Sequence, residues 1–251
     1  PTTNNEMMIS YPTTMMKNGR SFPQMLRAIA LFLLLATIPT VAQTLDPRAW
    51  DLGEPGPFVD VYVSPTGSDT NNGLTRQTPL RSVSTAWSLM NNTLLANFGF
   101  RINLMNGDHT CDLPDCTPIL TQTVATTRQH PIIIRAVDGA GSATLVGGLT
   151  LRNPSNVYLM DFSIRSIPGQ KPPSEALLAV FSGQNILLRN LRLIAPDPAQ
   201  YPENSDVDAG IGILNSTNLH VEQCQLQGQS ENGVVVVGSQ HVELLKNDIA
   251  G

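Results

Sequence analysis

The feature that most constrains this chain is a repeat in its second half. Four segments begin at residues 156, 185, 218 and 241 and align without gaps: NVYLMDFSI, NILLRNLRL, NLHVEQCQL and HVELLKNDI. If the first residue of each is counted as zero, positions one, three, six and eight are all apolar except for Asn247. Two runs of period two, interrupted by one extra residue, predict two short strands that meet at a bend and turn one face inward.

A third short apolar run precedes each segment, at 149–151, 177–181, 210–214 and 233–237. Each unit is then strand, turn, strand, bend and strand, with no helical pattern between them. A unit of this kind cannot bury its apolar face alone, so successive units must stack. The sequence therefore predicts an all-β fold, a single-stranded right-handed parallel β-helix or solenoid. A β-sandwich, the alternative, would show hairpins and no fixed phase between inward positions.

Two residues of the repeat have a predicted role in the core. Cys224 shares an inward position with Phe162 and Leu191, so we expect a buried structural thiol rather than a reactive one. Asn247 stands at the same position in the last unit. We expect its amide to bond to backbone groups at the bend, because buried polar groups need partners.

The segment YVSPTGSDTNNGLTRQTPLRSVSTAW (62–87), together with the repeat, resembles the pectate-lyase-like right-handed β-helix superfamily. Many exported members begin with Y-V-S-x-x-G-x-D-x-x-x-G and then T-P-[LF]-[KR]-[ST]. The matching residues here are Tyr62, Val63, Ser64, Gly67, Asp69 and Gly73, then Thr78, Pro79, Leu80, Arg81 and Ser82. The resemblance covers roughly residues 59–251. It implies an architecture rather than one activity, because the superfamily includes lyases, hydrolases, epimerases, adhesins and tailspikes.

Residues 59–99 are expected to form an N-terminal strand, a turn and a capping helix, and 100–251 the coils. Ser82 is a candidate N-cap, and apolar residues follow it at helical spacing: Val83, Ala86, Trp87 and Met90. We expect this helix to lie across the open first coil. In SPTGSDTNNG (64–73), we expect Gly67, Asn72 and Gly73 to take positive φ values. The last residues are in the middle of the pattern, which predicts a truncated C-terminus; a final coil that meets a partner is the alternative.

The N-terminal region is predicted to lie outside the fold. Residues 25–42 combine a basic flank, an apolar run and small residues before Gln43, as in a signal peptide. A retained anchor is the alternative, although the apolar run is shorter than the roughly 20 residues that span a bilayer. Residues 1–24 are a predicted disordered extension and 43–58 a linker. We expect a protein that is secreted or held at the cell surface, with no membrane span after cleavage.

Charge and cysteine content limit the partners. The chain has 15 Lys and Arg against 20 Asp and Glu, a net charge of −5, which gives no basic footprint for nucleic acid. We expect a monomer. In an oxidising compartment Cys111 and Cys116 are close enough in sequence for a small-loop disulfide, and two free thiols are the alternative.

Three insertions point to a polysaccharide groove. Residues 165–176, 194–209 and 227–232 all fall between the last strand of one unit and the first strand of the next, so they should emerge side by side. Candidate substrate-binding residues are Lys171, Tyr201, Glu203 and Glu231. Asp206 and Asp208, with Asn204, offer oxygen ligands for calcium as a possible cofactor; a solvated Pro-rich loop is the alternative.

The catalytic residues are less defined. The polygalacturonase-type N-T-D-G and G-D-D elements are replaced here by 204–207 (NSDV) and 228–231 (GQSE), which removes the paired aspartates of that hydrolase. Outward positions beside the insertions are apolar: Ala179, Phe181, Gly212, Leu214, Val235 and Val237. Arg189 and Glu222 should share a column about 4.8 Å apart, as a carboxylate clamp or as a surface ion pair. Arg189 and Lys246 are thus weak catalytic candidates for a lyase of an acidic glycan, and a non-catalytic adhesin or carbohydrate-binding protein is the alternative.

Overall fold

The computed structural model of the chain describes residues 58–90, 98–110, 118–122, 130–167, 174, 176–195, 209–228 and 232–250. The predicted extension at 1–24, the signal peptide at 25–42 and the linker up to residue 57 lie outside these residues. Within them, the strands form three sheets in which every pairing between neighbours is parallel.

The three sheets take one strand each from successive coils. Sheet A has the order β1 (Phe58–Val63), β2 (Gly99–Leu104), β5 (Ile132–Ala136), β8 (Ser155–Met160), β11 (Gln184–Arg189), β14 (Thr217–Glu222) and β17 (Gln240–Leu245). Sheet B contains β3 (Gly107–His109), β6 (Ala143–Val146), β9 (Ser163–Arg165), β12 (Arg192–Ile194), β15 (Gln225–Gln227) and β18 (Asp248–Ala250). Sheet C contains β4 (Ile119–Thr121), β7 (Leu149–Arg152), β10 (Ala176–Phe181), β13 (Ala209–Leu214) and β16 (Asn232–Val237).

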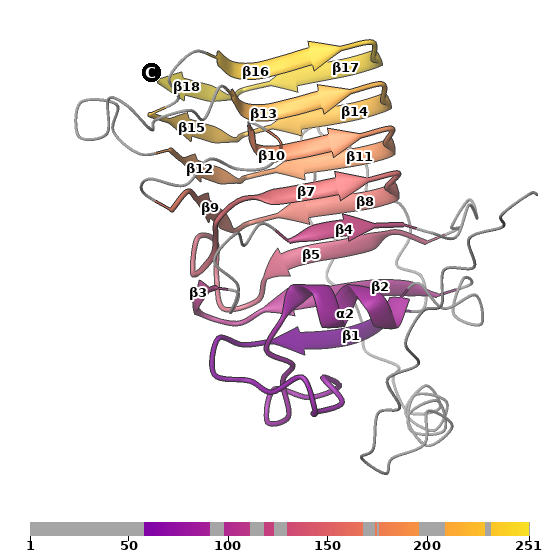
Figure 1. Cartoon of the computed structure of the whole chain (residues 1–251), viewed down its shortest axis with the longest axis vertical. Coiled ribbons are helices and arrows are strands. Elements are labelled where there is room, and N and C mark those ends of the chain that lie inside the picture. Colours follow the sequence, from indigo (N-terminus) through magenta and orange to yellow (C-terminus); the bar gives the residue numbers. More distant parts are fainter. Residues whose placement is uncertain are drawn as a thin grey trace, which may run out of the picture. The chain divides into compact units, whose positions relative to one another are not determined.

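The chain passes from sheet C to sheet A to sheet B and then rises to the next coil, as in β7, β8 and β9 followed by β10, β11 and β12 (Figure 1). This is a right-handed parallel β-helix, and it confirms the predicted fold class. The three predicted insertions each connect the end of a sheet B strand to the start of a sheet C strand. They therefore leave the same corner of successive coils, as expected.

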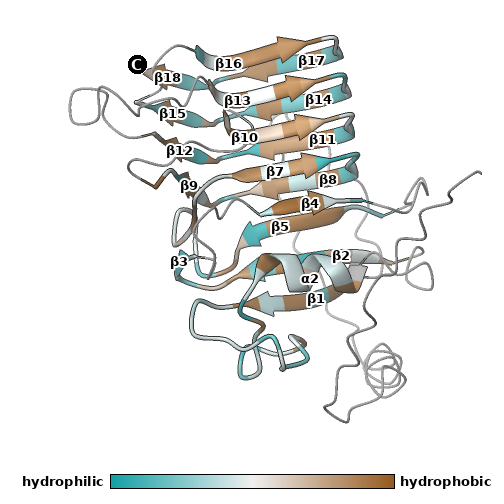
Figure 2. Cartoon of the chain, in the orientation of Figure 1, coloured by the Kyte–Doolittle hydropathy of each residue, from teal (hydrophilic) through white to brown (hydrophobic). Residues whose placement is uncertain are grey.

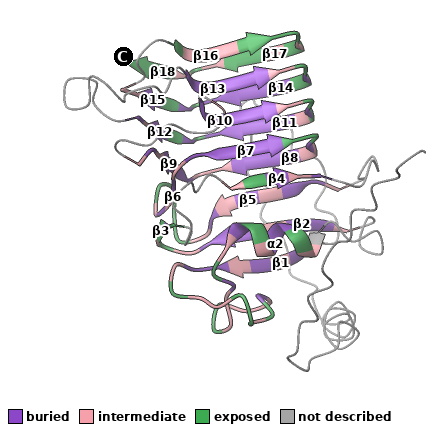
Figure 3. Cartoon of the chain, in the orientation of Figure 1, coloured by how far each residue is buried: buried purple, intermediate pink, exposed green. Residues whose placement is uncertain are grey.

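The core follows the columns that the repeat predicts. Val157, Ile186 and Leu219 are adjacent in sheet A, and Ile164, Leu193 and Leu226 in sheet B; all are at most 1% exposed. Hydrophobic and buried residues recur in the strands of successive coils (Figures 2 and 3). In the last described coil, Leu244 and Ile249 are 48% and 49% exposed, since β17 and β18 end their sheets.

The backbone conformation explains why each repeat segment begins with a polar residue. Asn156, Asn185, Asn218 and His241 all have φ between 54° and 60°, in the left-handed region. Asparagine tolerates this region better than most residues do. The same backbone conformation recurs at the bends after the sheet A strands. The residues with positive φ there are Asp161, Asn190, Gln223 and Lys246.

The two residues singled out in the core behave as predicted. Cys224 is fully buried and free. The Asn247 side chain accepts from the Cys224 backbone N–H at 2.9 Å and donates to the Val221 carbonyl at 2.8 Å. The amide thus satisfies backbone groups of the preceding coil at the bend.

Helix α2 (Val83–Met90) begins where the sequence predicts. The Thr85 backbone N–H donates to the Ser82 hydroxyl at 3.1 Å, which confirms the N-cap. The helix lies at the N-terminal end of the solenoid, beside β1 and β2, in agreement with the expected capping helix (Figure 1). The chain runs from α2 into β2 and β3, and the Trp87 indole donates to the Thr121 carbonyl of β4 at 3.0 Å. The helix therefore takes the place of a sheet C strand in the first coil (Figure 1).

The loop 64–80 covers the free edge of β1. Tyr62 donates its backbone N–H to Gly73 and accepts from Leu80, and Leu80 is fully buried. Of the three expected positive φ values, only that of Gly73 is observed, at 70°. Gly67 is needed for another reason, because a Cβ there would lie 2.2 Å from the Leu80 carbonyl oxygen. Asp69 accepts from the backbone N–H groups of Arg81 and Ser82, at 2.9 Å each, and so joins the loop to the start of the helix.

Candidate functional site

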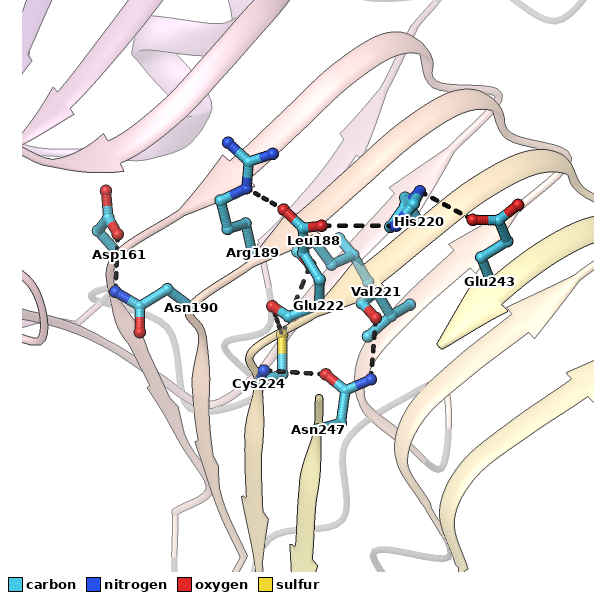
Figure 4. A network of polar contacts seen from close by, with 10 residues as sticks. All are labelled: Asp161, Leu188, Arg189, Asn190, His220, Val221, Glu222, Cys224, Glu243 and Asn247. Carbon is cyan, nitrogen blue, oxygen red and sulfur yellow. Dashed lines mark hydrogen bonds and ion pairs between the residues drawn. The ribbon is translucent and has the colours of Figure 1, made fainter. Parts of the chain in front are cut away.

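Charged side chains are concentrated on the outward face of sheet A, near its C-terminal end. The strand register places Arg189 beside Glu222, and His220 beside Glu243, as the repeat alignment predicts. We refer to Arg189, His220, Glu222 and Glu243 as the Arg189 network. It takes its members from three successive strands, β11, β14 and β17 (Figure 4).

The ion pair between Arg189 and Glu222 is enclosed. Arg189 Nε donates to Glu222 Oε1, and the two side chains are only 10% and 4% exposed. The interpretation of this pair as a surface ion pair is therefore wrong. Removing charges from water costs several kcal/mol per ion, and the cost is offset only when each charge has a good partner. Loss of either residue would leave the charge of the other enclosed without a partner.

His220 connects this enclosed pair to a second carboxylate. Its Nε2 lies 3.4 Å from Glu222 Oε2, and its Nδ1 lies 3.5 Å from Glu243 Oε2. The His220 side chain is 9% exposed and that of Glu243 is 67% exposed. The Arg189 network thus runs from an enclosed carboxylate, through an imidazole, to a carboxylate in solvent.

This arrangement has chemical uses. An imidazole between two carboxylates can take up a proton and pass it on, which is the task of a general acid or base. A guanidinium can bind a carboxylate through two parallel N–H donors. The terminal nitrogens of Arg189 point away from Glu222 (Figure 4). Enclosed clusters of ionisable groups are enriched at functional sites.

Cys224 lies close to the Arg189 network but does not share its chemistry. Its thiol contacts the backbone carbonyls of Leu188 and Glu222, at 3.6 and 3.5 Å. Burial raises the pKa of the Cys224 thiol to about 11. A cysteine acts as a nucleophile only as the thiolate, which this raised pKa disfavours. Cys224 is therefore a structural residue.

The other predicted site residues fall elsewhere. Lys246 is exposed at the bend after β17, with φ of 53°, in the place that Asn190 and Gln223 occupy in earlier coils. The predicted substrate-binding, calcium and disulfide residues lie outside the described part of the chain: Lys171, Tyr201, Glu203, Glu231, Asp206, Asp208, Cys111 and Cys116. They stay predictions.

The outward face of sheet C is apolar, as expected from the sequence. Ala179, Gly212 and Val235 share one column, and Phe181, Leu214 and Val237 share the next. The guanidinium of Arg152 lies 5.4 Å from the centre of the Phe181 ring. Ala179 and Gly212 are buried, Phe181 and Leu214 are half-buried, and the Arg152 cation lies over the Phe181 ring.

The repeat does not predict a second polar cluster, because the strands that form this cluster precede the repeat. Asp60 and Arg101 are neighbours in one outward column of sheet A, and Asn103 and Arg135 are neighbours in the other. The signal was present in FVDVYV, GFRINL and IIIRA, whose alternation would have aligned these strands.

The described residues contain no group of three or more His, Cys, Asp or Glu side chains arranged to hold a metal ion. No helix within these ranges is long and apolar enough to cross a membrane.

The chain matches no protein-family model and no curated protein. A rhamnogalacturonan lyase structure is similar, with 15% identity and a TM-score of 0.41 over 76% of this chain and 56% of that one. The structure of pectate lyase Pel9A is similar with 14% identity and a TM-score of 0.42, over 79% of this chain and 56% of that one. The chain thus spans just over half the length of each, and its fold assignment rests on its own strand pairing.

Proposed function

We propose that this β-helix protein binds and cleaves an acidic polysaccharide, as a lyase, through the outward face of sheet A. The observation that supports this proposal is the Arg189 network, in which a guanidinium, an imidazole and two carboxylates from three successive coils are joined. Arginine suits the carboxylate of a uronic acid, and histidine suits the proton transfer that elimination requires.

In this proposal Arg189 binds and neutralises the uronate carboxylate. His220 removes the proton from the carbon next to that carboxylate, and the electron pair forms a carbon–carbon double bond as the bond to the glycosidic oxygen breaks. The departing oxygen takes a proton from water. Glu243, which is exposed, then accepts the proton from His220 and returns it to solvent. Glu222 keeps both Arg189 and His220 in place.

The test is the absorbance of unsaturated products when the whole chain is incubated with uronate polymers in the presence of calcium. The wild type is expected to produce them, and His220→Gln to lower the rate by about 100-fold or more. His241→Asn is the matched control, because His241 lies where the earlier coils carry asparagine. The proposal fails if the wild type yields no product or if His220→Gln is as fast as His241→Asn.

The second candidate is a non-catalytic adhesin or cell-surface carbohydrate-binding protein. It is favoured by the outward face of sheet C, where Phe181 and Leu214 offer apolar contacts for sugar rings and no carboxylate pair is present among the described residues. Binding of a polysaccharide without any unsaturated product would favour this function. Phe181→Ala would then weaken binding, whereas His220→Gln would leave it unchanged.

A further inference from the structure

The second polar cluster on the outward face of sheet A carries positive charge that the described residues do not pair. Arg101 Nη2 donates to Asp60 Oδ2 at 2.7 Å, and Asn103 Nδ2 donates to Asp60 Oδ1 at 2.8 Å. Each oxygen of the Asp60 carboxylate thus accepts a hydrogen bond from this cluster. We refer to Asp60, Arg101, Asn103 and Arg135 as the Arg135 cluster.

Arg135 has an amide as its partner where a carboxylate would be expected. Its Nε donates to Asn103 Oδ1 at 3.0 Å, and Asn103 is 1% exposed. The charge of Asp161 also acts on Arg135, but that carboxylate accepts from Asn190, and these described residues form no ion pair with each other. Among the described residues, no carboxylate therefore contacts this half-buried guanidinium.

Like charge adds to this imbalance. Burial, and then the positive charge of Arg101, lower the pKa of Arg135, against the opposing effect of Asp60. Arg101 lies 5.2 Å from the centre of the Phe58 ring, and its buried Nε–H has no hydrogen-bond acceptor among the described residues. Buried donors without acceptors are rare in proteins, so Arg101 is suited to donate to an anionic ligand.

The Arg135 cluster is aligned with the Arg189 network. Arg135 pairs with Met160, and Met160 pairs with Arg189, in one outward column of sheet A. Strands of a sheet are about 4.8 Å apart, so the two arginines are roughly 10 Å apart along the solenoid axis. A linear polymer lying along this axis would bring charged groups past both.

We propose that Arg135 and Arg101 bind a carboxylate of the acidic polysaccharide, and that the polymer lies along the solenoid axis with a second carboxylate at Arg189. The inference rests on the proposed function and deepens it, because it assigns a second subsite and an orientation. Two guanidiniums and one occupied carboxylate give the site the charge that a uronate ligand complements.

The test is binding of galacturonate oligomers of increasing length to the whole chain, measured by calorimetry. Arg135→Gln keeps an N–H donor for Asn103 but removes the charge. It is expected to weaken binding of long oligomers by about tenfold and to leave a disaccharide bound only at Arg189 unaffected. Arg165→Gln is the matched control, because Arg165 is an exposed sheet B arginine paired with Asp108. It is expected to change nothing.

The outcomes separate the two proposals. If the wild type binds no oligomer of any length, the proposed function fails. If the wild type binds but Arg135→Gln and Arg165→Gln bind long oligomers equally well, the second subsite is wrong and the proposed function stands. Thermal unfolding in sodium galacturonate provides a second measurement. Stabilisation of the wild type that is lost in Arg135→Gln supports the subsite, and equal stabilisation of both contradicts it.

Discussion

Arg189 and Glu222 face away from the core of the solenoid, yet their side chains are only 10% and 4% exposed. An enclosed ion pair at an outward position is costly, and apolar residues of similar size would serve stability as well or better. In the same column, Met160 precedes Arg189 and Leu245 follows Glu222. The ion pair is therefore expected to add little stability compared with an apolar pair at the same positions.

The enclosure of this pair predicts how single and double substitutions differ. Glu222→Ala is expected to lower the free energy of unfolding by about 3–5 kcal/mol, because it leaves the Arg189 charge enclosed without its carboxylate. The double variant Arg189→Met with Glu222→Leu continues the apolar column and is expected to be as stable as the wild type. Urea unfolding measures both. Equal losses in the two variants would show that the ion pair itself stabilises the fold.

The thiol of Cys224 is predicted to be unreactive in the folded protein. With its pKa raised to about 11 by burial, it is protonated at pH 8 and shielded from reagents. In a chain with Cys111→Ser and Cys116→Ser, a thiol reagent should label Cys224 only as fast as the protein unfolds, and denaturant should restore rapid labelling. Rapid labelling without denaturant would contradict the core position.

His109 is predicted to make stability depend on pH. Burial lowers the pKa of His109, against the opposing effects of its hydrogen bond to the Met105 carbonyl and of Asp108. The unfolded chain then binds the proton more readily than the folded protein does. Stability should be full above the unfolded pKa of about 6.5 and should fall as the pH drops from there toward the folded value.

The control is His109→Leu, since Leu145 holds the adjacent inward position. Chemical unfolding at pH 7.5 and pH 5.5 should show a larger loss of stability on acidification in the wild type than in this variant. The same loss in both proteins would assign the pH dependence to other groups.

The left-handed residues at the start of each repeat predict a backbone effect. Asn218 has φ of 60°, and its side chain donates to Asn185 Oδ1 at 2.6 Å. Asn218→Ala is expected to lower the free energy of unfolding by about 1–2 kcal/mol, because alanine is strained in this region and loses the bond. Asn218→Gly should lose less, since glycine adopts this φ without strain. A glycine variant less stable than the alanine variant would contradict this account.

The coil architecture could be predicted from the sequence because its inward columns are set by local alternation. The fixed phase from Val157 through Ile186 to Leu219 identified the stacking, and the same register placed Arg189 beside Glu222 and His220 beside Glu243. Period-two patterns carry this information in every strand.

Burial on the outward face and the contacts of the helix could not be predicted in the same way. The alternation of apolar and polar residues predicts that Glu222 faces outward. It does not predict whether other parts of the protein enclose that side chain. For α2, the apolar stripe predicts a buried face but not the residues it contacts, such as the Thr121 carbonyl that accepts from the Trp87 indole. The Arg135 cluster required the alignment of β1, β2 and β5, which precede the repeat.

The central claim is that the outward face of sheet A recognises the carboxylates of a polysaccharide. The most direct measurement compares the affinity of the whole chain for an oligogalacturonide with its affinity for the same oligomer after reduction of its carboxylates to neutral alcohols. We expect the acidic oligomer to bind at least about tenfold more tightly, with affinity that falls as salt is added. Equal affinity for the acidic and the reduced oligomers would contradict the claim.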